Sequence, residues 1–137
     1  MPRKRLVDLS HGGRMILTFP WPPRELSPNA RVHWAKKARA AKKYKNNCGW
    51  ICKAAKLPRI APGPVHLAIV AYPPDNRHRD ADNIMASLKN CQDAISWGFG
   101  INDRYFTSNF DWGRVMKGGV IQIEITWGAI KPARIAA

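Results

Sequence analysis

The segment V120-I-Q-I-E-I-T-W127 decides the fold class of this chain. Apolar residues at the odd positions from 121 to 127 alternate with polar residues at the even positions between them. Strict alternation is typical of a strand that buries one face. The preceding K117-G118-G119 predicts a turn, and residues 106–116 predict a strand that pairs with 120–127. The sequence therefore predicts a hairpin at the end of the domain.

Two further strands and two helices are predicted upstream of this hairpin. Residues 15–19 predict a short strand that ends at P20-W21-P22-P23, because proline cannot continue a ladder. Residues 65–72 are mostly apolar and predict a buried strand. Apolar residues recur at helical spacing from about 34 to 57 and from about 82 to 97. The order β-α-β-α-β-β predicts an α+β single domain, with two main helices against a mixed sheet of about four strands.

Length and composition fit one folded domain. The chain has 137 residues and 45% hydrophobic residues, enough for a modest core. We expect this core over about 15–127, with a flexible basic N-terminus at 1–13 and a loose tail at 129–137. No apolar run approaches the roughly 18 residues of a membrane span, and no signal peptide is expected. The three cysteines form no even framework, which predicts a reduced, cytoplasmic protein without a disulfide-linked partner.

The charge of the chain points to a polyanionic partner. Lys and Arg number 23 against nine Asp and Glu, for a net charge of +14. Nucleic acid is the first choice of partner and a membrane surface a weaker one, because contacts with phosphates release counterions. Residues 1–60 hold fifteen of the basic residues and only two acids. A solvated face is the simplest explanation of the basic helix, but we prefer a DNA-contacting role for Lys36, Lys37, Arg39, Lys42, Lys43, Arg77 and Arg79.

Five of the nine acids fall within residues 75–103, which predicts a separate site. Asp82, Lys89 and Asp93 lie within about 20° of one line on the second predicted helix. Acids beside a phosphate-binding surface repel the ligand unless a cation intervenes. Mg²⁺, for which Mn²⁺ could substitute, prefers carboxylate and phosphate oxygens. We therefore expect Asp80, Asp82 and Asp103 to bind Mg²⁺, and Lys89 to orient the attacking water or neutralise charge on the phosphate.

Three motifs together resemble the RusA-type Holliday junction resolvases. They are R79-D80-A81-D82-N83, L88-K89-x-x-x-D93-A94-I95 and G98-F99-G100-I101-N102-D103, and the early F19-P20-W21-P22-P23 is similar to the family's first strand and loop. The resemblance spans about residues 15–127. It implies a homodimeric, Mg²⁺-dependent endonuclease that nicks four-way DNA junctions symmetrically.

By motif position, the resemblance places the family's metal-binding carboxylates on Asp80, Asp82 and Asp103, and its catalytic lysine on Lys89. Two departures stand out. Lys89 lies seven residues after Asp82, where the best-known pattern has four. Asn102 precedes Asp103, where the family often has a second acid.

Several alternatives remain open from the sequence. The chain could be a non-catalytic basic DNA- or RNA-binding protein in which Asp80 or Asp82 caps a helix. It could also be an Mg²⁺-dependent nuclease that acts on flaps or other branched DNA. Cys48 and Cys52, with His33 and Cys91, could bind zinc, but without a C-x-x-C pair we favour free, partly buried thiols.

The six tryptophans are expected to lie mostly in the core or an interface. An exposed aromatic side chain could wedge into an opened junction, and Trp21 and Phe106 are the candidates. His78, between two arginines, is interpreted as an ordinary loop residue.

Overall fold

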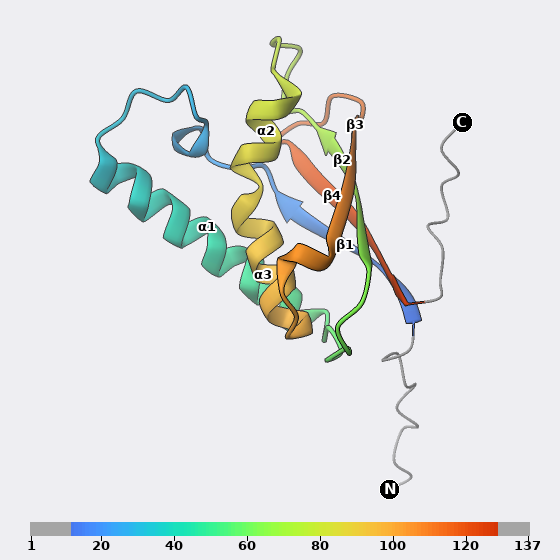
Figure 1. Ribbon diagram of the computed structural model, residues 1–137. Helices are drawn as coiled ribbons and strands as arrows, with labels where there is room; N and C mark the ends of the chain where they lie inside the picture. Colours follow the sequence, from blue (N-terminus) through green and yellow to red (C-terminus); the bar gives the residue numbers. More distant parts are fainter. Residues whose placement is uncertain (1–11, 129–137) are drawn as a thin grey trace, which may run out of the picture.

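A computed structural model describes residues 12–128 of the chain. A twisted sheet forms one layer, and the helices cover one of its faces (Figure 1). The predicted α+β class and four-stranded mixed sheet are confirmed. The elements in chain order are β1 (Gly12–Pro20), α1 (Trp34–Ala54), β2 (Val65–Tyr72), α2 (Ala81–Ser87), α3 (Lys89–Phe99), β3 (Phe106–Trp112) and β4 (Val120–Gly128), with short 3₁₀ helices at Arg24–Leu26 and Asp103–Tyr105.

The strand order in the sheet is β1-β4-β2-β3. β4 runs antiparallel to both β1 and β2, whereas β3 pairs with β2 in parallel. The predicted hairpin between residues 106–116 and 120–127 is therefore wrong, because β2 lies between those two strands. The loop after β3 passes the end of β2, where the Gly113 and Met116 amides each donate a 2.8 Å hydrogen bond, to the Ala71 and Pro73 carbonyls.

The distribution of apolar side chains explains this strand order. β2 and β4 place completely buried residues on the helix-covered face, including Leu67, Ile69, Ile123 and Ile125. Strands of this kind favour the centre of a sheet. β3 is mostly exposed or half-buried, so it lies at the edge. The sheet's central pair is thus β4 and β2, the two strands with the clearest apolar pattern.

The second predicted helix, residues 82–97, is not continuous. It breaks at Leu88 into α2 and α3, which lie end to end in Figure 1. The Ser87 hydroxyl donates a 2.9 Å hydrogen bond to the Asn83 carbonyl, and such a bond four residues back competes with the helix ladder and bends it. α3 then ends at Gly100, whose φ of 72° is the left-handed conformation of a helix C-cap.

α1 packs on the sheet and α3 through one narrow stripe. Tyr44, Cys48 and Cys52 recur every four residues and are buried, and the helix runs without a break through Gly49. The three cysteines are free thiols, and all are buried, more completely than the partly buried positions that were predicted. Cys48 Sγ lies 3.0 Å from Cys91 Sγ, which places these two thiols between α1 and α3.

Most of the tryptophans lie outside the core, which leaves an interface as the other position expected for them. Trp127 is buried against Phe99, with ring centroids 5.1 Å apart. Trp34, Trp50, Trp97 and Trp112 are exposed. The narrow stripe on α1 explains why Trp50 points outward, since it falls off the four-residue spacing of the buried side chains.

Gly12 and Gly13 of the predicted flexible N-terminus belong to β1 and pair with Gly128 and Trp127. The rest of that segment and the predicted tail at 129–137 lie outside the described residues. Between residues 12 and 128, no helix combines the length and apolar character needed to cross a membrane.

Candidate functional site

Lys89 joins two of the acidic residues that the sequence predicts for one site. Its Nζ lies 2.8 Å from Asp103 Oδ2 and 3.2 Å from Asp93 Oδ1. Asp93 follows one turn later on α3, while Asp103 comes from the 3₁₀ helix beyond it. The Asn102 side chain starts that helix by accepting a 2.8 Å hydrogen bond from the Arg104 amide. Asn102 thus fixes the segment that brings Asp103 to Lys89.

The pair of carboxylates raises the pKa of Lys89 above its ordinary value of 10.5. The hydrogen bond to Asp103 contributes most, followed by the hydrogen bond to Asp93. The Lys89 side chain is 61% exposed, so solvent screens these interactions. At neutral pH Lys89 is therefore a cation that can neutralise negative charge, and it is unsuited to act as a base.

Asp80 and Asp82 lie at the start of α2. Asp80 is the N-cap residue, and its Oδ1 accepts a 2.8 Å hydrogen bond from the Asp82 amide. Asp82 occupies the first turn and is exposed. Within residues 12–128, the Asp82 carboxylate makes no hydrogen bond or ion pair. The structure thus gives Asp80 a capping role and leaves Asp82 open to solvent.

The three predicted metal ligands do not form one group. Over residues 12–128, no three His, Cys, Asp or Glu side chains are gathered closely enough to hold a metal ion. Asp103 contacts Lys89, and the break at Leu88 interrupts the helix that was to align Asp82 with Lys89.

The loop before α2 is ordered by an acid and two arginines. Arg79 lies 2.8 Å from Asp75 and stacks over Trp21, with its Cζ 5.5 Å from the ring centroid. The Arg77 amide, and then Arg79, lower the pKa of Asp75. The Arg79 side chain is 17% exposed and braces the loop, whereas that of Arg77 is 80% exposed and lies 3.3 Å from Asp75 Oδ2. Trp21 is half-buried, and Phe106 is as well.

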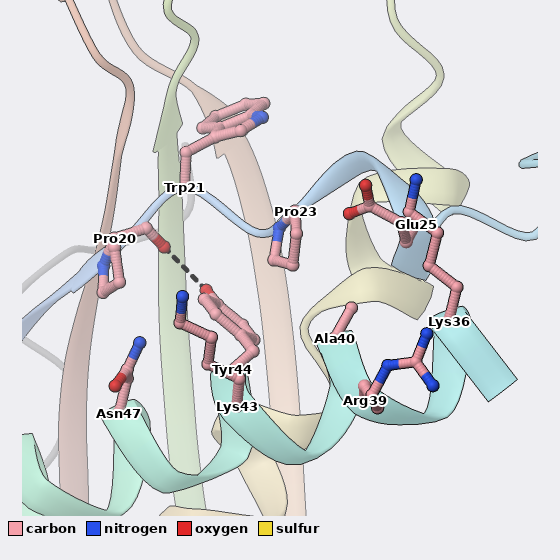
Figure 2. Close-up of a pocket in the computed structure, with 10 residues that line it drawn as sticks. All are labelled: Pro20, Trp21, Pro23, Glu25, Lys36, Arg39, Ala40, Lys43, Tyr44 and Asn47. Carbon is pink, nitrogen blue, oxygen red and sulfur yellow. Dashed lines mark hydrogen bonds between the residues drawn. The ribbon is translucent and has the colours of Figure 1, made fainter.

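A basic groove separates α1 from the segment that follows β1 (Figure 2). It has a volume of about 530 Å³. Lys36, Arg39 and Lys43 line its α1 wall, opposite the proline-rich segment 20–23. The Tyr44 hydroxyl donates a 2.7 Å hydrogen bond to the Pro20 carbonyl and so fixes the two walls together (Figure 2).

The predicted DNA-contacting residues of α1 therefore divide into two groups. Lys36, Arg39 and Lys43 share the groove, which also contains one acid, Glu25. Lys37 and Lys42 are not among the residues that line it. Lys42 is exposed and Lys37 half-buried.

Sequence reasoning missed a second groove, of about 410 Å³, between α1 and α3. Trp50 and Trp97 line it together with Lys45 and Lys53. The signal was present in the sequence, because both tryptophans fall outside the apolar stripes of their helices.

No model of a known protein family matches the chain. The chain is similar to an uncharacterized protein of Xylella fastidiosa (strain Temecula1 / ATCC 700964), with 39% identity over 100 residues. The match covers 68% of this chain and 63% of that protein, so the chain spans less than two thirds of its relative's length.

Proposed function

We propose that this protein is an Mg²⁺-dependent endonuclease that resolves four-way DNA junctions as a homodimer, as the RusA resemblance implies. The observation that carries the proposal is the position of Lys89, 2.8 Å from Asp103 and 3.2 Å from Asp93. Two of the three motifs of that resemblance are thereby in direct contact. The third, around Asp80 and Asp82, begins the helix that leads into α3.

The residues present fit a magnesium ion held by two carboxylates. Mg²⁺ usually takes one or two protein carboxylates, and substrate phosphate oxygens and water complete its coordination. Asp80 and Asp82 would hold it, since both are carboxylates at the exposed start of α2. When bound, Mg²⁺ polarises the scissile phosphate and lowers the pKa of an attacking water. Because Asp103 contacts Lys89, we assign it the role of positioning that lysine.

The remaining roles belong to basic side chains. Lys89 neutralises charge that develops on the phosphate, for which its protonated state is suited. Lys36, Arg39 and Lys43 bind backbone phosphates in the groove beside α1. A two-fold dimer would present two such sites to the two strands that are cut. A DNA substrate also implies a cytoplasmic location.

A second candidate is a basic DNA-binding protein without catalytic activity. It is favoured by the capping hydrogen bond from the Asp82 amide to Asp80 and by the ion pairs of Lys89, because both interactions stabilise local structure on their own. In that case the acids would serve the fold and the basic residues would bind DNA.

The deciding experiment uses a synthetic four-way junction with each strand labelled in turn. We expect paired nicks with Mg²⁺ or Mn²⁺, none with EDTA, and none with Asp82→Asn in any condition. Glu124→Gln is the matched control, because it removes the same charge from β4, whose even-numbered residues face away from the helices. A wild-type protein that binds the junction without cutting it supports the non-catalytic candidate. A nuclease that cuts a flap faster than a junction has the flap, and not the junction, as its substrate.

A further inference from the structure

Two exposed tryptophans face a common groove between α1 and α3. Trp50 is 67% exposed and Trp97 is 74% exposed, and both line the groove of about 410 Å³. Tryptophan is highly buried on average, so leaving two large rings in water beside one concavity is costly unless a ligand covers them.

The same groove carries positive charge. Lys45 and Lys53 line it, and the Lys53 Nζ lies 5.2 Å from the centroid of the Trp50 ring. Its other lining residues are Asn46, Gly49 and Ala94, so none of the residues that line it is acidic. Flat aromatic surfaces beside lysines match a ligand that has both planar rings and phosphates.

The groove continues toward the acidic site. Lys45 and Trp97 also line an adjoining groove of about 500 Å³, to which Arg59, Asp93 and Asn102 contribute. Asp93 is an ion-pair partner of Lys89. The two grooves thus form one path from the candidate catalytic residues, past Trp97, to Trp50.

We propose that this path binds an unpaired DNA strand, whose bases stack on Trp97 and Trp50. Lys45, Lys53 and Arg59 contact its phosphates. The inference rests on the proposed function for the identity of the ligand as DNA. An unpaired strand fits better than a duplex, because stacking on a side chain needs a base face that paired and stacked bases do not offer. A junction that opens at its centre exposes such bases.

The test is a binding measurement in EDTA, which needs no cleavage. The probes are a fluorescein-labelled oligothymidylate and a labelled duplex of equal length, followed by anisotropy at one salt concentration. We expect Trp50→Ala and Trp97→Ala each to weaken oligothymidylate binding about 5- to 150-fold, the range that follows from the loss of one stacked base. Duplex binding should change less than about twofold, and Trp97→Phe should recover much of the loss.

Trp34→Ala is the matched control. Trp34 is 76% exposed at the start of α1 and lines neither groove, so its removal should leave both probes unaffected. Equal oligothymidylate binding by wild type and both groove variants would overturn the inference. So would a Trp97→Ala protein that sediments as a monomer where wild type is a dimer, since the tryptophans would then form a subunit contact.

The outcomes separate the two proposals. Tryptophan-dependent binding of the single strand by a protein that never nicks a junction would refute the nuclease and keep the binding path. Nicking with no effect of the tryptophans on binding would keep the nuclease and refute the path.

Discussion

Lys89 Nζ and Asp103 Oδ2 lie 2.8 Å apart, which ties the first residue of α3 to the 3₁₀ helix that follows it. The carboxylate raises the pKa of the lysine, so its charge is retained across the physiological range. This ion pair holds Lys89 as a cation at the edge of the candidate site, so substitution of Lys89 should affect catalysis through the loss of its charge.

Lys89→Ala should reduce the rate of nicking by about 10²- to 10³-fold, because one charge that stabilises the transition state is lost. Junction affinity in EDTA should change little, since a single exposed cation contributes a small part of binding. Lys89→Arg should retain much of the activity. Single-turnover nicking and gel-shift affinity on the same preparations measure both effects.

The pH profile tests the protonation state. If Lys89 acts as a cation, wild type and Lys89→Arg should have parallel profiles from about pH 6 to pH 9, because neither side chain loses its proton in that range. A rising limb in wild type that Lys89→Arg abolishes would instead identify Lys89 as a base and contradict this role.

The groove beside α1 predicts which basic residues contact DNA. Lys36→Ala, Arg39→Ala or Lys43→Ala should weaken junction binding and lower the slope of log affinity against log salt by about one unit each. Lys42→Ala should have a smaller effect, since Lys42 lies outside the groove. Affinities at four salt concentrations give the slopes.

Arg14→Ala is the control for charge alone. Arg14 is exposed on β1, whereas the alternate residues Gly13, Leu17 and Phe19 of that strand are buried or, like Met15, half-buried. If its removal lowers the slope as much as Arg39→Ala does, the net charge of the protein, and not the groove, determines binding.

Local patterns of the sequence were sufficient to predict most of the elements. Each of these patterns lies within one segment: the alternation over 120–127, and the helical spacing of Tyr44, Cys48 and Ala55. Such elements can be predicted without knowing how distant parts of the chain pack together. The order of the strands was not predictable in the same way. A glycine turn between residues 106–116 and 120–127 suggests a hairpin, but the apolar β2 takes the central position and excludes that pairing.

In the candidate site, too, contacts within one segment were predictable and contacts between segments were not. The spacing of Lys89 and Asp93 within one helix predicted their shared face, and the two side chains do meet. The contact between Lys89 and Asp103 depends on the path of the chain between them, which the spacing alone could not supply. The break at Leu88 had a signal in Ser87, whose hydroxyl can compete with the helix hydrogen bonds.

The buried thiols predict how stability changes at high pH. Burial, and then the neighbouring Cys91, raise the pKa of Cys52 from 9.0 to about 12. The unfolded chain therefore releases this proton at lower pH than the folded chain does. The contribution of Cys52 to stability is complete below pH 9 and is lost as the pH rises from 9 to about 12.

Over that interval Cys52 should lower the free energy of unfolding of wild type by up to about 1.4 kcal/mol per pH unit. Cys52→Ala removes this contribution, so the stability of the variant should fall less steeply. Urea unfolding with a reductant at about pH 8, 9 and 10 gives both slopes. Parallel slopes would mean that the Cys52 thiol titrates alike in the folded and unfolded chains.

Asp80 allows capping and metal binding to be separated by two substitutions of one residue. Its Oδ1 accepts the 2.8 Å hydrogen bond from the Asp82 amide that starts α2. Asparagine also offers an oxygen to such an amide, whereas alanine offers none. Asp80→Ala should therefore lower the free energy of unfolding by about 1 kcal/mol, and Asp80→Asn should leave it nearly unchanged.

The nicking activities of Asp80→Ala and Asp80→Asn should not differ in the way that their stabilities do. A metal ligand needs the carboxylate charge, so Asp80→Asn should abolish nicking as completely as Asp80→Ala does, while the fold stays intact. Junction binding in EDTA should stay equal or tighten in both variants, because a negative charge beside the DNA is removed. Urea unfolding, gel-shift affinity and Mg²⁺-dependent nicking on the same proteins test all three expectations. If Asp80→Asn cuts the junction at the wild-type rate, the carboxylate serves only to cap α2, and the magnesium site at the start of this helix is refuted.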